Sequence, residues 1–318
     1  MTAISAPQTR SLPVRSLLQR FGLVLSFVLL CVVLSLLSDR FLTTQNLINV
    51  LRQSTINGII AVGMTFVILT AGIDLSVGAT LALSAVVTAD LMQKGVPVFA
   101  AVLIGLALGA LLGLVNGLLV SRTKVPPFIV TLGMMTVARG LTLTYTQGRP
   151  ITGLPDAFRF IGTGSIGPIP MPIIIAAVVF VGGYLLLDRT RYGQAIRAIG
   201  NNPVAARFAG IPTRRYITFV YVLAGTLAAL AGSILTARLN SAQPTAGISY
   251  EFDAIAAVVV GGTSFSGGEG NLGGTLLGVL VIAVLNNGLN LLNVASFWQP
   301  VVTGVVIALA LLLYRLIR

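Results

Sequence analysis

Long uninterrupted apolar blocks are the feature of this 318-residue sequence that most limits its fold. A helix needs roughly 20 apolar residues to cross a bilayer, and many of the blocks reach or approach that length. Only 9% of the residues are charged, whereas a soluble domain carries roughly 25%. A soluble core would also show short apolar stripes at the period of a helix or strand. The sequence therefore predicts an all-α integral membrane protein.

Ten apolar segments predict about ten transmembrane helices, some of them broken or re-entrant. They cover residues 21–38, 54–71, 76–92, 97–120, 128–147, 169–187, 216–238, 252–264, 273–294 and 299–315. The eighth is too short to cross a membrane alone, because a helix rises about 1.5 Å per residue. We expect that segment to be extended, broken or re-entrant.

The first apolar segment is predicted to be a transmembrane helix and not a cleaved signal. No small-residue cleavage pattern follows it, and it is long enough to span a membrane. Residues 1–20 are accordingly interpreted as a cytoplasmic segment. Residues 21–318 are interpreted as a single transmembrane domain, with a cytoplasmic loop at residues 188–215.

The distribution of positive charge predicts that both termini are cytoplasmic, because cytoplasmic loops carry an excess of Lys and Arg. With the N-terminus inside, the cytoplasmic basic residues are Arg10, Arg15, Arg20, Arg122, Lys124, Arg189, Arg191, Arg197, Arg207, Arg214, Arg215, Arg315 and Arg318. Those outside are Arg40, Arg52, Lys94, Arg149, Arg159 and Arg238. Arg139 then lies in or near the membrane. A residue of this kind is costly in lipid, so Arg139 is expected to face protein or water.

Several function classes are disfavoured by composition. The chain has no histidine and a single cysteine, Cys31, so it predicts no disulfide framework, no histidine-ligated metal and no Ser-His-Asp site. The net charge is +12, but the basic residues flank apolar segments and do not cluster on a soluble face. Nucleic acid is therefore not expected as a partner.

The fourth apolar segment carries a glycine stripe. Gly105, Gly109, Gly113 and Gly117 are each four residues apart and share one helix face. Small residues at this spacing let another helix backbone approach closely. Close helix packing is the favoured interpretation, and a pore-lining groove is the alternative.

The cytoplasmic loop contains a short helix with strong end signals. In residues 202–212, NPVAARFAGIP, Asn202 is a suitable N-cap and Pro203 suits the first helical position. Gly210 can adopt the left-handed conformation that ends a helix. Two helical turns are rarely stable alone in water. Val204 and Phe208, four residues apart, are therefore expected to enter a partner's groove or to rest on lipid.

Three stretches carry a resemblance to a known family: residues 63–78 (GMTFVILTAGIDLSVG), 127–135 (PFIVTLGMM, followed by Arg139) and 250–264 (YEFDAIAAVVVGGTS). Along nearly all of its length the chain resembles the permease subunits of the ribose, xylose and galactose importers, which are driven by an ATP-binding-cassette (ABC) ATPase. Residues 241–247 (SAQPTAG) look most like the ribose branch. Residues 202–210 coincide with the family's ATPase-coupling segment, so Asn202, Pro203, Val204, Arg207, Phe208 and Gly210 are the expected coupling residues.

The resemblance implies both a location and a set of partners. The location is the bacterial inner membrane. Two copies of the chain would form the pore, a cytoplasmic ATPase would dock to it, and a periplasmic binding protein would deliver a monosaccharide. ATP would be bound by the ATPase, because this sequence contains no Gly-x-x-x-x-Gly-Lys-Ser/Thr phosphate loop. No cofactor and no catalysis are therefore expected of the chain itself.

Two stretches also resemble each other without gaps: residues 72–81 (GIDLSVGATL) and 267–276 (GGEGNLGGTL). Each interrupts an apolar segment with a carboxylate, Asp74 or Glu269, and each offers an N-cap to the next helix, Ser76 or Asn271. Paired interruptions mark the transport site in many carriers. The pattern predicts a repeat on the cytoplasmic side of the translocation path. Two ordinary helix starts are the alternative interpretation.

Two other function classes remain as alternatives to an ABC permease. One is a proton-coupled or passive sugar carrier that acts without an ATPase. Such carriers often relay protons through buried acids and histidines, and this chain has no histidine and only eight acids. The other is an intramembrane enzyme, for which no nucleophile paired with a base is evident.

Overall fold

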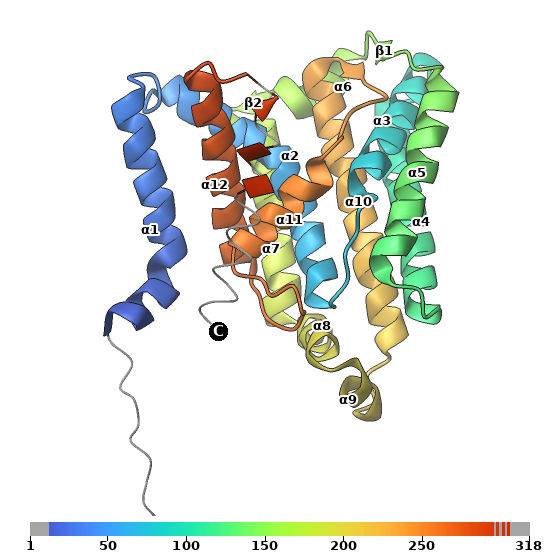
Figure 1. Ribbon diagram of the computed structural model, residues 1–318. Helices are drawn as coiled ribbons and strands as arrows, with labels where there is room; N and C mark the ends of the chain where they lie inside the picture. The colour runs from blue at the N-terminus through green and yellow to red at the C-terminus, as the bar shows by residue number, and fades with distance from the viewer. Residues whose placement is uncertain (1–12, 296, 299–300, 303, 306–318) are drawn as a thin grey trace, which may run out of the picture.

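The computed structural model describes residues 13–295, 297–298, 301–302 and 304–305. Within these residues the chain is almost entirely helical, as predicted, and its long helices run alongside one another in a bundle (Figure 1). Six helices of this part are long and apolar enough to cross a membrane. They are α2 (Thr44–Leu69), α4 (Val98–Arg122), α5 (Pro127–Thr146), α7 (Met171–Arg189), α10 (Thr213–Leu239) and α12 (Leu272–Leu291).

The remaining elements are shorter or only partly apolar. They are α1 (Pro13–Leu37), α3 (Val77–Gln93), α6 (Asp156–Thr163), α8 (Arg191–Asn201), α9 (Pro203–Phe208) and α11 (Tyr250–Val260). Two pairs of two-residue strands lie in the connections. β1 (Ile151–Thr152) is antiparallel to β4 (Ser241–Ala242), and β2 (Ser165–Ile166) is antiparallel to β3 (Ile169–Pro170).

Each of the first nine predicted apolar segments contains a helix, and the tenth, 299–315, lies largely outside the described residues. The eighth segment forms α11, which has only 11 residues and is too short to cross a membrane, as expected. The largest boundary error is at α2. This helix begins at Thr44, ten residues before the predicted start at 54, because its first turns are polar and carry no apolar signal.

The core is formed by α2, α10, α11 and parts of α3 and α12, whose apolar side chains make the largest buried cluster. Most of the apolar window of α2 is buried, at 78%, whereas no more than 28% of each corresponding window of α4, α5 and α7 is buried. Exposed apolar helices are stable in lipid but not in water. The inner helices are therefore surrounded by helices whose outward apolar faces are suited to lipid.

Two non-helical connections lie within the length of the bundle instead of beyond its ends. Residues 70–76 leave the end of α2 and lead inward to α3, which begins partway along the bundle (Figure 1). Residues 243–249 enter from the opposite end and lead to α11. Non-helical backbone at membrane depth is tolerated only when protein or a water-filled cavity surrounds it. Both connections are therefore candidates for functional segments.

Candidate functional site

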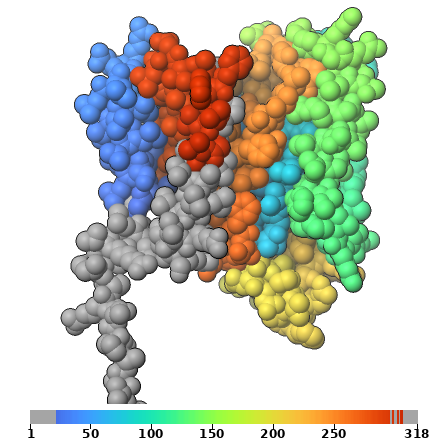
Figure 2. Space-filling model, viewed as in Figure 1, coloured from blue at the N-terminus to red at the C-terminus, as the bar shows by residue number. Residues whose placement is uncertain are grey.

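The predicted coupling helix is α9, at the end of the molecule where α8 and α9 project beyond the other helices (Figure 2). The side chain of Asn202 accepts hydrogen bonds from the backbone N–H groups of Val204 and Ala205, at 3.0 and 2.9 Å. Pro203 is the first helical residue, and Gly210 has a φ of 81°. The local signals in the sequence therefore produce the helix they predict.

The two large apolar side chains at positions 204 and 208 of α9 face away from the rest of the chain. Phe208 is 89% exposed and Val204 is 62% exposed, while Ala206 is buried between α9 and its neighbours. Exposing a whole phenyl ring to water forgoes roughly 1.5–3 kcal/mol of burial free energy. A short helix that presents such a ring outward is suited to binding another surface.

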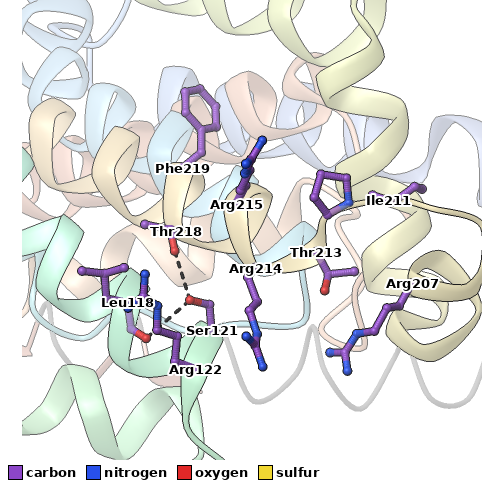
Figure 3. A pocket seen from close by; sticks show the side chains of 11 residues that line it. Leu118, Ser121, Arg122, Arg207, Ile211, Thr213, Arg214, Arg215, Thr218 and Phe219 are labelled. Carbon is purple, nitrogen blue, oxygen red and sulfur yellow. Dashed lines mark hydrogen bonds between the residues drawn. The ribbon is translucent and has the colours of Figure 1, made fainter.

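A cavity of about 830 Å³ lies beside α9, between the end of α4 and the start of α10 (Figure 3). Four exposed arginines line it, namely Arg122, Arg207, Arg214 and Arg215. Within the described part of the chain, none of the four forms an ion pair. Arg207 and Arg214 point to one side in Figure 3 and Arg215 to the other. The surface around α9 is therefore both apolar and strongly basic.

Only Arg207 of these four was predicted as a site residue. The other three come from the start of α10 and the end of α4. A hydrogen bond between the hydroxyl oxygens of Ser121 and Thr218, 3.0 Å apart, joins these two helices at the cavity. The sequence shows an excess of basic residues on both flanks of the loop. This pattern did not predict that Arg122, at the end of α4, would line the same cavity.

The carboxylate of Asp74 is buried inside the extended connection 70–76, with 1% exposure. Its Oδ1 atom accepts hydrogen bonds from the backbone N–H and the hydroxyl of Ser76, at 2.9 and 2.6 Å. The amide of Asn116 on α4 donates to the same hydroxyl at 2.9 Å. The expected cap by Ser76 is therefore wrong: its side chain makes no capping bond to α3, because it is used by Asp74 and Asn116.

Three further elements hold this connection in place. The hydroxyls of Thr131 on α5 and Tyr221 on α10 donate to the carbonyl of Ile73, at 3.2 and 3.4 Å. The backbone N–H of Gly268, in the loop before α12, donates to the carbonyl of Leu69 at 2.9 Å. The two stretches predicted to be a repeat therefore begin beside each other, at the end of the bundle that carries α8.

The two stretches nevertheless differ in their local chemistry. Asn271 caps α12 as expected, accepting from the backbone N–H of Gly274 at 2.7 Å. Glu269 is exposed, whereas Asp74 is buried. Glu269 lies in a loop at the surface of the described chain, and Asp74 lies inside it. Structural equivalence of the two stretches stays a prediction.

Arg139 on α5 faces protein, as expected for a charged residue at membrane depth. Its Nη1 donates to the carbonyls of Pro244 and Ala246, at 2.7 and 2.9 Å, and so anchors the connection that leads to α11.

The starts of α3 and α11 meet nearby. A Cβ atom on Gly78 would lie 2.1 Å from the carbonyl oxygen of Gly247, so only glycine permits this contact.

The glycine stripe of α4 faces other helices and not an open groove. Cβ atoms added to Gly109, Gly113 and Gly117 would lie 2.2–2.7 Å from α10 atoms, mostly of its backbone. A Cβ on Gly105 would lie 2.0 Å from the hydroxyl oxygen of Thr88 on α3. The stripe therefore lets α4 approach α10 and α3 closely, which is the packing interpretation, and it does not line a pore within the chain.

Comparison with known proteins identifies the family. A family model described as "Branched-chain amino acid transport system / permease component" matches residues 46–311. The ribose import permease protein of Bacillus subtilis is 54% identical over 94% of this chain and 93% of its own length. That of Haemophilus influenzae is 47% identical, covering 91% and 90%. The D-allose transport system permease protein of Escherichia coli is 44% identical, covering 89% and 87%. No solved structure gives a significant match.

The chain therefore belongs to the family of permease components of bacterial ABC importers. Within this family it groups with the sugar import permeases, and it is a multi-pass protein of the bacterial cytoplasmic membrane. An importer of this class also comprises an ATPase and a binding protein, so the energy source lies in another subunit.

Proposed function

We propose that this chain carries ribose across the cytoplasmic membrane as the permease subunit of an ABC importer. The observation that supports ribose is the 54% identity to a ribose import permease over 94% of the chain. The proposal includes ten membrane spans with both termini cytoplasmic, residues 188–215 as the coupling loop, and a second copy of the chain across the translocation path. The family resemblance supports the dimer.

We propose α9 as the element through which the ATPase acts on the permease. Phe208 and Val204 offer an apolar contact, and Arg122, Arg207 and Arg214 surround it with positive charge. A partner with an apolar groove and an acidic rim would complement this face. Complementary charge guides association and orientation, while buried apolar contacts supply much of the affinity.

Transport measurements on the intact importer test the function. The permease, ATPase and binding protein expressed together in cells are expected to accumulate labelled ribose. Accumulation should persist when an uncoupler collapses the proton gradient while ATP is maintained, and it should stop when ATP is depleted. The reverse result would support the proton-coupled carrier. Preference for allose over ribose would reject the proposed sugar and leave the importer class intact.

Replacement of Asp74 by asparagine is expected to reduce uptake at least about tenfold without loss of assembly. The Asn side chain keeps an Oδ1 acceptor for both hydrogen bonds from Ser76, while the buried charge is removed. Ionisable groups at membrane depth are costly and usually functional. The measurement compares ribose uptake with the yield of ATPase that co-purifies. The control is Asp156→Asn, which neutralises an exposed carboxylate on α6. Wild-type uptake by Asp74→Asn would reduce Asp74 to a structural acceptor.

A further inference from the structure

A second cavity, of about 370 Å³, lies between α2, α10, α11 and α12. It is bounded by the first half of α2 and the second half of α12, at the end of the bundle remote from α9 (Figure 1). The first turns of α11 contribute Tyr250 and Asp253 from the middle of the bundle. In the predicted orientation the cavity therefore occupies the outer half of the membrane, above the point where α3 and α11 meet.

The lining of this cavity is unusually polar for the interior of a membrane protein. Asn49, Gln53 and Asn57 are four residues apart and form a row of amides along one face of α2. Asn286 and Asn290 form a shorter row on α12. Polar side chains within a membrane are costly and usually line a water-filled or substrate path. The amide row is also the sequence signal for this site, because its spacing is that of a helix face.

Some polar atoms of the cavity lack a partner. The amide nitrogen of Asn57 donates to a carboxylate oxygen of Asp253 at 3.2 Å, so its carbonyl oxygen is left over. That oxygen, the side-chain carbonyl oxygen of Asn286 and Nε of Arg52 are buried without a hydrogen-bond partner in the described part of the chain. Buried polar atoms of native proteins are nearly always satisfied, by protein, water or ligand. A guest that both donates and accepts hydrogen bonds would satisfy these two acceptors and one donor.

A sugar meets this requirement. Each hydroxyl group is at once a donor and an acceptor, so one polyol can serve amide oxygens, a carboxylate and an arginine together. Arg52, Arg238 and Asp253 all line the cavity, so the lining is not the single-sign cluster that an anion prefers. The volume lies within the range of roughly 300–1,000 Å³ found for small-molecule sites. Val279 and Ile282 supply an apolar wall for the ring carbons.

We propose that this cavity is a monosaccharide-binding site within each permease chain, which receives the sugar before it passes the contact between α3 and α11. The proposal rests on the proposed import function and adds the site at which the sugar is held. Asn57, Asn286 and Asp253 hydrogen-bond its hydroxyls, and Arg52 and Arg238 supply donors.

The test uses the complete importer reconstituted in vesicles, with the Asn57→Leu and Asn286→Leu variants. Each replaces an amide by an apolar group of similar size. Ribose uptake at saturating binding protein is expected to fall about tenfold or more in each variant. ATP hydrolysis stimulated by the binding protein, and co-purification of the ATPase, are expected to stay unchanged, because the cavity is remote from α9.

A matched control lies on the same two helices. Asn46 and Asn287 hydrogen-bond each other through both amides, at 3.0 and 2.9 Å, and neither lines the cavity. The double variant Asn46→Leu/Asn287→Leu removes both members of this pair at once, which can be nearly neutral; it also removes the hydrogen bond of 2.9 Å that Asn46 donates to the carbonyl of Phe41. We expect it to transport ribose at the wild-type rate.

The possible results distinguish a wrong assignment of the cavity from a wrong choice of transported sugar. If the wild-type importer accepts allose and not ribose, the proposed sugar is wrong, and the variants are then measured with allose. Uptake within twofold of wild type in both variants would overturn the cavity assignment. A parallel loss of uptake and of stimulated ATP hydrolysis would also overturn it, because the amides would then be structural. Inhibition of wild-type uptake by inorganic phosphate, absent in the variants, would assign the cavity to an anion.

Discussion

The Phe208→Asp variant is expected to reach the membrane in normal amounts and to lose its ATPase, and with it ribose uptake. Phe208 is 89% exposed, so the chain itself gains little from the ring. Exposed substitutions of this kind usually change the free energy of unfolding by about 0.5 kcal/mol or less. In a docked complex the new carboxylate would be enclosed by an apolar groove, where an unpaired charge is strongly unfavourable.

The expected loss of affinity is about 2 kcal/mol or more, which is typical when a central interface residue is changed, and this corresponds to roughly 30-fold weaker binding. The measurement is the ratio of ATPase to permease after purification, together with uptake. The control is Ile166→Asp, which makes the same kind of change at an exposed residue of β2, outside α8 and α9. Full complex formation and full uptake by Phe208→Asp would show that the ATPase docks elsewhere.

The Gly109→Leu variant is expected to fail at an earlier stage, in the folding of the permease. A Cβ atom at this position would lie 2.4 Å from the carbonyl oxygen of Gly225, and a Cβ on Gly225 would lie 2.2 Å from that of Gly109. Both contacts involve backbone, so neither helix can relieve the clash by turning a side chain. Overpacking of a core typically costs about 1–3 kcal/mol, and a forced separation of α4 from α10 should exceed that range.

The measurement is the yield of folded protein and its thermal stability in detergent. A cost of about 3 kcal/mol lowers the Tm of a domain of 150–250 residues by roughly 6–12 °C, and the decrease is smaller for a longer chain such as this one. The matched control is Gly133→Leu on α5, where nothing lies within 4 Å of an added Cβ. Normal yield and stability of Gly109→Leu would contradict the close approach of α4 to α10.

Much of the architecture could be predicted because membranes impose strong rules on a sequence. Backbone groups in lipid must bond internally, so long apolar blocks become helices whatever their neighbours are. The bounds of α9 were equally predictable. Asn202, Pro203 and Gly210 act on backbone groups within a few positions of themselves, so their effects need no tertiary contact. The glycine stripe also had a predictable consequence, since its spacing defines one helix face.

The interior contacts could not be predicted, because they join residues that are distant in the chain. Arg139 binds carbonyls 105 and 107 residues away, and Asn57 meets Asp253 across 196 residues. Ser76 had the right position for a cap, but Asn116, 40 residues later, and Asp74 determine where its hydroxyl points.

The sequence alone thus determined that the chain is helical, that it belongs in a membrane, and that α9 is a bounded helix on a basic loop. These properties depend on local composition and spacing. Only the tertiary structure decided that four arginines surround one cavity beside α9 and that amides of α2 and α12 line another. Such sites depend on which helix faces meet, and that choice is made by the packing of the whole bundle, including the backbone approach that Gly109 and Gly113 allow.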